Sequence, residues 1–192
     1  EAEVLLIEIG GTIGDIETDL YVEAARQLSS RLKSSDKLFV HLTYVPVPYG
    51  VNEQKSKPTQ QSVSLIQSKG IHPDIIIGRC KEILTKNIKD KISLFAGVPS
   101  SHVITGLDVD NIYKIPLIFA SENLPKIIQS KLKIKVKPDL SVLRDLVTNM
   151  SAAKKSITVA IAGKYTRLED SYASIIEALK HCSANLHTKI EI

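Results

Sequence analysis

Short apolar runs alternate with longer amphipathic segments along most of the chain. The apolar runs predict strands at residues 4–7, 38–47, 75–77, 103–104, 115–119 and 157–162. Those at 4–7, 75–77 and 157–162 are continuous enough for strands buried in the sheet. The amphipathic segments have the length of helices and lie at residues 20–32, 58–69, 88–95, 139–154 and 174–181. This alternation predicts an α/β fold, a doubly wound parallel sheet covered by helices.

Turn residues and apolar spacing define several of these helices further. Pro58 suits the first turn of a helix, Gly70 ends that helix, and Gly97 ends the next one. The first helix is predicted to bury a stripe of residues spaced four apart, widened by two neighbours: Leu20, Ala24, Leu28 and Leu32, with Val22 and Ala25.

Composition excludes several classes of protein. Of the 192 residues, 43% are hydrophobic and 24% are charged, which excludes a disordered chain. No apolar run reaches the roughly 20 residues that span a bilayer, so we expect no membrane protein. The net charge of +4 favours the binding of anionic small molecules. The aromatic content of 5% and the lack of a basic stripe argue against nucleic-acid binding.

The cysteines and the two ends indicate the setting of the chain. Cys80 and Cys182 lie far apart, with no zinc or disulfide spacing, which favours a reducing cytoplasm. The sequence starts without a Met or a signal peptide, and residues 189–192 resemble a beginning strand. We expect an internal fragment with residues 1–132 in one domain, a helical linker at 133–155 and the opening of a second domain at 156–192.

A parallel sheet binds ligands beyond the carboxyl ends of its strands, which directs attention to the loops there. Glu8 ends an apolar run before a glycine-rich loop, where a carboxylate can hold Mg²⁺ against phosphate oxygens. The alternative is an ordinary turn in which Asp15 and Glu17 favour a helix N-terminus. The loop lacks the Gly-Lys-Ser/Thr ending of a P-loop.

Two further segments have the residues for nucleotide binding. Lys55 and Lys57 directly precede a helix N-terminus, which suits a phosphate chain, although a solvated basic loop is the alternative. The acidic residues at 106–110 follow a strand, where a cation, a ribose or a plain turn would fit. Lys91 alone reads as a surface lysine, and Cys80, between two basic residues, could have a lowered thiol pKa.

Four strings make a more specific pattern. They are EIGGTIGDIE at 8–17, EQKSKPTQQSV at 53–63, DVDNIYKIPL at 108–117 and VAIAGKYTRLEDSYASIIEALKH at 159–181. In this order they resemble the CTP synthase family, from the C-terminal part of its synthetase domain to the opening of its glutaminase domain. The resemblance implies a dethiobiotin-synthetase-like P-loop fold followed by a class I glutamine amidotransferase fold.

The resemblance also implies an activity and a set of binding residues. The family makes CTP from UTP: ATP phosphorylates the uracil O4, and ammonia from glutamine then displaces that phosphate. Glu8 would be a Mg²⁺ ligand, and the ATP contacts would be Leu107, Asp108 and Val109. UTP, or CTP as an inhibitor, would bind to Asp15, Ile16, Glu17, Lys55, Ser56, Lys57, Pro58, Thr59, Gln60 and Lys91.

Family features outside these 192 residues shape the remaining expectations. The phosphate loop and the first Mg²⁺ aspartate would precede residue 1, and the glutaminase nucleophile would follow residue 192. No catalytic residue therefore falls within the chain, and we expect it to be inactive alone. The family implies a homotetramer whose subunits meet at the pyrimidine site. Glutamine and GTP would act through the second domain. Whether the protein forms filaments is left open. Two alternatives remain: another glutamine-dependent amidoligase, or a non-catalytic UTP/CTP-binding or filament-forming module.

Overall fold

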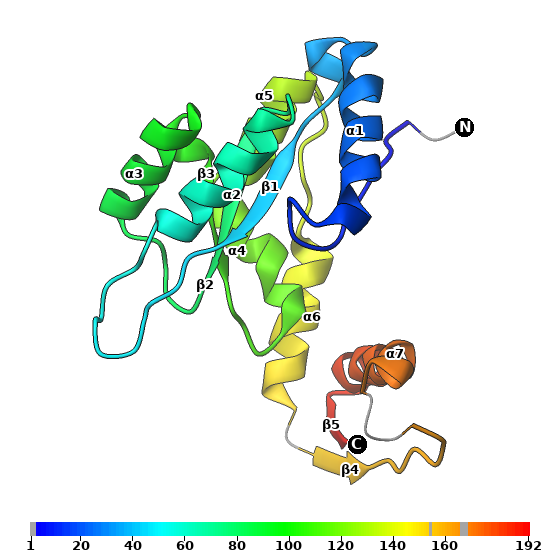
Figure 1. Ribbon diagram of the computed structural model, residues 1–192. Helices are drawn as coiled ribbons and strands as arrows, with labels where there is room; N and C mark the ends of the chain where they lie inside the picture. The colour runs from blue at the N-terminus through cyan, green and yellow to red at the C-terminus, as the bar shows by residue number, and fades with distance from the viewer. Residues whose placement is uncertain (1–2, 154, 166–168) are drawn as a thin grey trace. The chain divides into compact units, whose positions relative to one another are not determined.

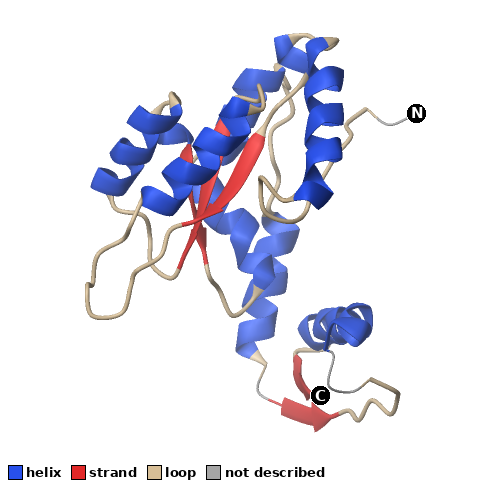
Figure 2. Cartoon of the chain, viewed as in Figure 1, coloured by secondary structure: helices blue, strands red, loops and turns tan. Residues whose placement is uncertain are grey.

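The computed structural model describes residues 3–153, 155–165 and 169–192 and contains two compact units. The first unit comprises Glu1–Asp108 and Ile118–Lys137, and the second comprises Val109–Leu117 and Pro138–Ile192. The chain thus enters the second unit for nine residues, 109–117, and then returns to the first. Each unit has its own parallel sheet (Figure 2).

The first unit is built on a parallel sheet of three strands in the order β1-β2-β3. The strands are β1 (Val40–Tyr44), β2 (Ile75–Cys80) and β3 (Val103–Leu107). In their register Val40 lies opposite Ile75, and Ile76 lies opposite Val103. The predicted α/β fold with a parallel sheet is therefore confirmed.

Helices pack on both faces of this sheet (Figure 1). On one face, α2 (Lys57–Ser68) and α3 (Lys86–Ala96) form the connections between the strands, and their apolar residues pack with Ile76 and Cys80. On the other face, Ile75 and Ile77 pack with residues of α4 (Ile115–Ser121) and α5 (Leu124–Leu132). The strand β2 is apolar at successive positions because both of its faces are buried.

Local sequence explains the ends of α2 and α3. Pro58 lies in the first turn of α2, where a missing backbone N–H costs no hydrogen bond. Thr85 precedes α3, and its hydroxyl accepts a hydrogen bond from the Ile88 amide. Gly97 ends α3 with φ of 73°, a left-handed conformation that glycine adopts without a steric penalty.

The buried face of the first helix agrees only in part with the predicted one. The helix α1 (Ile16–Ser30) buries Val22, and Ala25 packs in the same cluster against α2. The two neighbours that widen the predicted stripe, Val22 and Ala25, are therefore confirmed, whereas the residues spaced four apart face solvent: Leu20 is 80% exposed and Leu28 is 48% exposed. Apolar residues lie on two sides of this helix, and packing against α2 and Ile71 decided between them.

Three further predicted strands are wrong or changed. Residues 4–7 form no strand and are exposed, because an apolar run becomes a strand only when another strand pairs with it. Residues 115–119 belong to the helix α4, in which Pro116 occupies the first turn and lacks the donor that a central strand needs. The strand predicted at 38–47 is shorter, and it ends before Pro46.

The second unit contains a smaller parallel sheet of β4 (Lys155–Thr158) and β5 (Thr188–Glu191). Its helices are α6 (Ser141–Ala152) and α7 (Ala173–Asn185), both close to their predicted positions. The strand predicted to be buried at 157–162 is instead β4, which is exposed and pairs only with β5 among the described residues. Residue 154, the predicted helix end, and residues 166–168, inside the last motif, lie outside the described residues.

Short 3-10 helices complete both units: Ser34–Asp36, Ser100–His102, Ile112–Lys114 and Glu169–Tyr172. Within the described ranges, every helix is too short or too polar to cross a lipid bilayer.

Candidate functional site

The carboxyl ends of the three strands lie at one edge of the first sheet because the strands are parallel. The loop 45–56 follows β1, the loop 81–85 follows β2, and Asp108 follows β3. Most of the residues that the sequence singled out for phosphate and nucleotide binding therefore come from this edge.

Gln54 joins two of these loops and was not singled out by the sequence. Its Nε2 donates to the carbonyl oxygens of Glu82 and Ile83 at 3.2 and 3.0 Å, and its Oε1 accepts from the Thr85 amide at 3.0 Å. The side chain is 6% exposed, so these bonds form largely out of contact with water. Gln54 thereby attaches its own loop, which also contains Lys55, to the segment that precedes α3.

Replacing Gln54 by alanine is expected to destabilise the first unit by about 1–3 kcal/mol, because partly buried backbone groups lose their partners. Urea unfolding and hydrogen exchange of the Thr85 amide would measure the change. Gln61→Ala is the matched control, since Gln61 is an exposed glutamine of α2. Equal stability of the two variants would contradict the role assigned to Gln54.

The N-terminus of α2 presents the predicted phosphate-binding residues to solvent. Lys57 and Pro58 are exposed in the first turn. Ser56 precedes the helix, and its hydroxyl accepts a hydrogen bond from Gln60 Nε2 at 3.1 Å. First-turn amides without partners and a nearby ammonium group can together hold an anion.

Thr59 differs from its neighbours because its side chain is fully buried. Its hydroxyl accepts a hydrogen bond from Thr43 Oγ1 at 3.1 Å and donates to the carbonyl oxygen of Tyr44 at 3.2 Å. The hydroxyl thus anchors the start of α2 to the end of β1. A ligand at this helix terminus would meet the backbone of Thr59 and not its side chain.

Lys55 contacts the Glu53 carboxylate, and the charge of Lys91, 36 positions further along the chain, also acts on it. Lys55 Nζ forms an ion pair with Glu53 at 2.5 Å, and the Lys55 amide donates to the carbonyl oxygen of Pro46. The hydrogen bond and charge of Lys55, and then the charge of Lys91, lower the pKa of Glu53. Lys91 is exposed on α3. Together with Lys57, these residues provide three cationic side chains for a phosphate chain.

Asp108 is held at the end of β3 by two contacts to β2. Its amide donates to the carbonyl oxygen of Cys80 at 2.8 Å, and its Oδ1 accepts from Arg79 Nε at 3.1 Å. The sequence had not singled out Arg79, which lies one register position before Cys80 on the central strand. Leu107 ends β3, and Val109 begins the nine-residue segment of the second unit.

The acidic candidates around the first helix form a separate group. Glu8, Ile16 and Glu17 are exposed, and Asp15 directly precedes α1. Asp15 Oδ2 accepts from the Thr12 amide at 3.3 Å, which closes the glycine-rich turn. Within the described ranges, no hydrogen bond or ion pair joins this group to the three lysines or Asp108, and no cluster of three His, Cys, Asp or Glu residues has metal-binding geometry.

The lowered thiol pKa considered for Cys80 from its basic neighbours is wrong. Its side chain is completely buried. Burial, together with the carboxylates of Asp108 and Glu122, raises the pKa of its thiol to about 11. The basic neighbours in sequence do not offset this, so the thiol stays protonated and unreactive at neutral pH.

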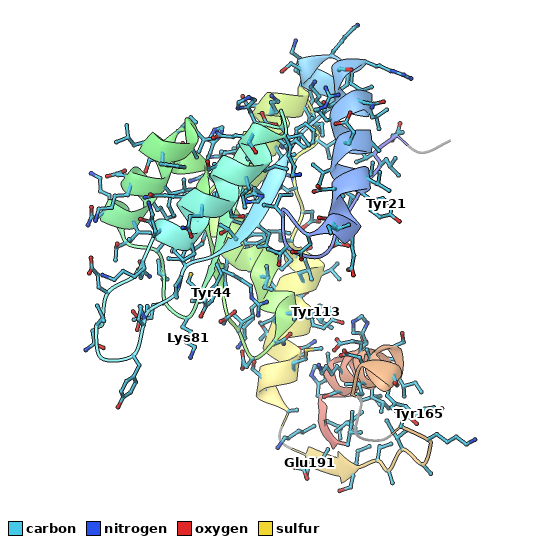
Figure 3. The ribbon with its side chains drawn as sticks, in the orientation of Figure 1. Tyr21, Tyr44, Lys81, Tyr113, Tyr165 and Glu191 are labelled. Carbon is cyan, nitrogen blue, oxygen red and sulfur yellow. The ribbon has the colours of Figure 1, made fainter. Side chains whose placement is uncertain are left out.

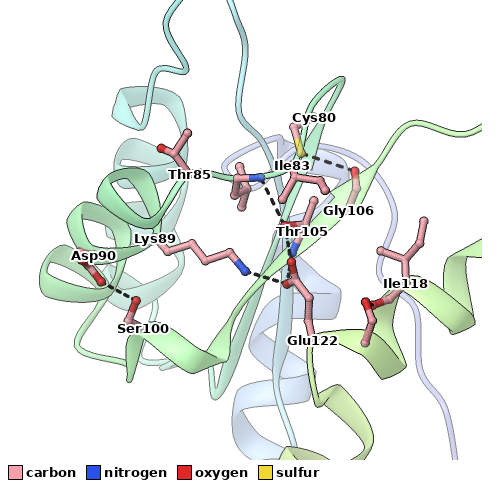
Figure 4. Close-up of polar contacts among 12 residues, drawn as sticks. Cys80, Ile83, Thr85, Lys89, Asp90, Ser100, Thr105, Gly106, Ile118 and Glu122 are labelled. Carbon is pink, nitrogen blue, oxygen red and sulfur yellow. Dashed lines mark hydrogen bonds and ion pairs between the residues drawn. The ribbon is translucent and has the colours of Figure 1, made fainter.

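A polar network behind this edge connects α3, β3 and the end of α4 (Figure 4). Glu122 Oε2 accepts from Lys89 Nζ and from the Thr105 amide, both at 2.8 Å, and its Oε1 accepts from the Thr105 hydroxyl at 2.6 Å. Thr105 Oγ1 in turn accepts from the Leu84 amide at 3.4 Å. The network holds β3, which ends in Asp108, against α3. Nothing in the sequence pattern marked Glu122 for this role.

Comparison with known proteins places these motifs in a family context. The family model described as "CTP synthase N-terminus" matches residues 1–134. The chain is 48% identical to a protein named "CTP synthase" from Borreliella afzelii (strain PKo), over 99% of the chain and 36% of that protein. It is 44% identical to "CTP synthase" of Pyrococcus furiosus and 43% identical to that of Archaeoglobus fulgidus, again over 36% of each relative. The chain spans about a third of the length of these curated relatives.

Proposed function

The chain belongs to the CTP synthase family, and from this premise we propose that it is part of an enzyme that converts UTP to CTP. The resemblance drawn from the four sequence motifs is confirmed by the family model over residues 1–134 and by the relatives, which align over 99% of the chain. In the proposed reaction, ATP transfers its γ-phosphoryl group to O4 of uracil. Ammonia then attacks C4 and phosphate leaves, so that UTP, ATP and ammonia give CTP, ADP and phosphate. Glutamine hydrolysis in the second domain would supply the ammonia.

The two lysines at the start of α2, Lys55 and Lys57, carry this proposal. A pyrimidine triphosphate has several negative charges, and two lysines at a helix N-terminus complement them. The charge of Lys91 on α3 also acts on Glu53, the partner of Lys55, and would add to this positive field. Binding there requires Lys55 to exchange Glu53 for a phosphate oxygen. Ser56, Pro58, Thr59 and Gln60 would complete the triphosphate site.

The other proposed contacts come from the acidic group and from β3. Asp15, Ile16 and Glu17 would line the pyrimidine end of UTP, and of CTP when it inhibits. Leu107, Asp108 and Val109 would contact ATP. Arg79 forms an ion pair with Asp108 and would therefore set the orientation of its carboxylate.

Mg²⁺ would be held in the proposed site through Glu8. Enzymes bind Mg²⁺ with one or two carboxylates plus substrate phosphates, so an exposed glutamate beside a glycine-rich turn suffices as one ligand. When bound, the ion would neutralise charge on the phosphates. The residues of this chain do the positioning: Glu8 would supply its carboxylate, and the three lysines would hold the triphosphate.

The wider organisation is also part of the proposal. Residues 1–132 would belong to a synthetase domain of the P-loop dethiobiotin-synthetase type, 133–155 would form the linker, and 156–192 would open a class I glutamine amidotransferase domain. We expect a homotetramer, with glutamine and GTP acting through the second domain. The free cysteines fit a cytoplasmic enzyme.

The full-length protein that carries this chain tests the proposal directly. With UTP, ATP and Mg²⁺, it is expected to form CTP with either ammonia or glutamine as the nitrogen source. Chromatography of the nucleotides measures the CTP formed. The 192-residue chain alone is expected to form none. Tight UTP or CTP binding without turnover would favour a non-catalytic module. Amidation of a carboxylic acid in place of UTP would favour a different glutamine-dependent amidoligase.

A further inference from the structure

Residues 109–117 are held in the second unit by a cluster around Tyr113, which is labelled in Figure 3 together with five other residues. Asn111 starts this anchor: its Oδ1 accepts from the Tyr113 amide at 3.0 Å, and its Nδ2 contacts Met150 Sδ of α6 at 3.2 Å. The amide side chain therefore fixes the backbone of Tyr113 and ties it to α6.

The Tyr113 side chain contacts two residues on one face of α7. Its hydroxyl lies 2.8 Å from Glu177 Oε2 and 2.6 Å from His181 Nε2. Glu177 and His181 are four positions apart, so they lie one turn apart on the helix. The rings of Tyr113 and His181 also meet edge to face, with centroids 5.1 Å apart.

The chemistry of the three groups defines the direction of each hydrogen bond. Hydrogen bonds from Lys180 and Tyr113 lower the pKa of Glu177, so its carboxylate is ionised at neutral pH and only accepts. The single hydroxyl hydrogen of Tyr113 must therefore point to Glu177. His181 Nε2 must then carry a hydrogen and donate it to the hydroxyl oxygen. The Tyr113 hydroxyl therefore both donates and accepts, and among the described residues it makes the only hydrogen bonds between 109–117 and α7.

The same segment begins at the proposed ATP contact. Asp108 is fixed to β2 through Cys80 and Arg79, and Tyr113, five residues later, is fixed to α7. The chain between them is short and held at both ends. A displacement of Asp108 by a ligand therefore acts on a segment whose other end is attached to the start of the proposed glutaminase domain.

We propose that Tyr113 is a positioning residue that couples the nucleotide contact at Asp108 to the second unit through Glu177 and His181. The proposal rests on the proposed function, since it assigns ATP to Asp108 and glutamine hydrolysis to the second domain. A coupling contact works in both directions. If ATP changes the affinity of the enzyme for glutamine, glutamine changes the affinity for ATP by the same factor.

The test measures the factor by which ATP changes the rate of glutamine hydrolysis in the full-length enzyme. Tyr113→Phe keeps the ring and removes the hydroxyl, and it is expected to reduce this factor about 5-fold or more. Ammonia-supported CTP formation at saturating ATP is expected to stay within about 2-fold of the unchanged enzyme, because it needs no signal from the second unit. Glu177→Ala should give the same loss, and combining both changes should add nothing further.

Tyr21→Phe is the matched control, since Tyr21 is an exposed tyrosine of α1 and makes no hydroxyl contact among the described residues. If ATP changes the rate of glutamine hydrolysis by the same factor in Tyr113→Phe as in the unchanged enzyme, the coupling role is overturned. An equal fall of both reactions also overturns it, because that indicates damage to the fold alone. If the unchanged enzyme makes no CTP even from ammonia, the proposed function itself is wrong, which is a separate result.

Discussion

Replacing Lys55 and Lys57 together by alanine is expected to weaken the binding of UTP and CTP about 100-fold in the full-length protein. Each lysine offers a charge-assisted hydrogen bond to a phosphate, and two such bonds account for about this factor. The change also removes positive charge from a helix N-terminus that attracts anions. Calorimetric titration of both nucleotides with Mg²⁺ measures the effect.

The chain offers a closely matched control in Lys135→Ala combined with Lys137→Ala. These two lysines have the same spacing and are exposed, and they lie in a segment without regular structure. The net charge changes equally in both double variants, so a general electrostatic effect would lower affinity in both. Loss of affinity confined to Lys55 and Lys57 supports a triphosphate at α2. Equal affinity of the two double variants would remove the main support for this site.

Glu122→Ala is expected to produce the largest loss of stability, about 2–4 kcal/mol for the first unit. The change leaves the Lys89 ammonium, which is 20% exposed, without its partner, together with two donors of the fully buried Thr105. Urea unfolding and hydrogen exchange of the Thr105 amide would report the loss. Glu122→Gln retains hydrogen-bond acceptors and should lose less, and the exposed Glu82→Ala should change little.

Stability should also depend on pH through Glu122. Burial raises the pKa of this carboxyl, but hydrogen bonds from Lys89 and Thr105 outweigh it and leave the pKa below its ordinary value of 4.5. Because the pKa is lower in the folded state, Glu122 contributes its full stabilisation at pH values above the pKa of the unfolded state. This stabilisation declines as the pH falls through the pKa of the folded state. This acid sensitivity should be weaker in Glu122→Gln. An identical acid dependence of the two proteins would contradict it.

The central part of the fold could be predicted from the sequence because its local and tertiary preferences agree. Residues 75–77 and 103–104 are apolar at successive positions, and both segments became strands buried on both faces. The glycine and proline residues at the ends of α2 and α3 indicated helix boundaries close to the observed ones. Residues 4–7 and 115–119 are equally apolar, but one had no strand to pair with and the other continued a helical turn.

The candidate site divides in the same way. Glu8, the lysines at 55 and 57, and Asp108 stood out because motif and position after a strand both pointed to them. Gln54, Arg79 and Glu122 could not be found, since a single polar residue in a loop or strand has no distinguishing local pattern. The partners of Gln54 and Arg79 are 28–31 positions away, and those of Glu122 are 17–33 positions away. Only folding brings such partners within hydrogen-bonding distance.

The sequence by itself determined the family, the parallel α/β sheet and the segments that hold the proposed ligand contacts. These properties depend on residue order and short-range periodicity, which a chain expresses before it folds. Only the tertiary structure decided which face of α1 is buried, that Thr59 is an anchor, and that Tyr113 meets Glu177 and His181. Each of these depends on distances between residues far apart in the chain, and packing sets such distances.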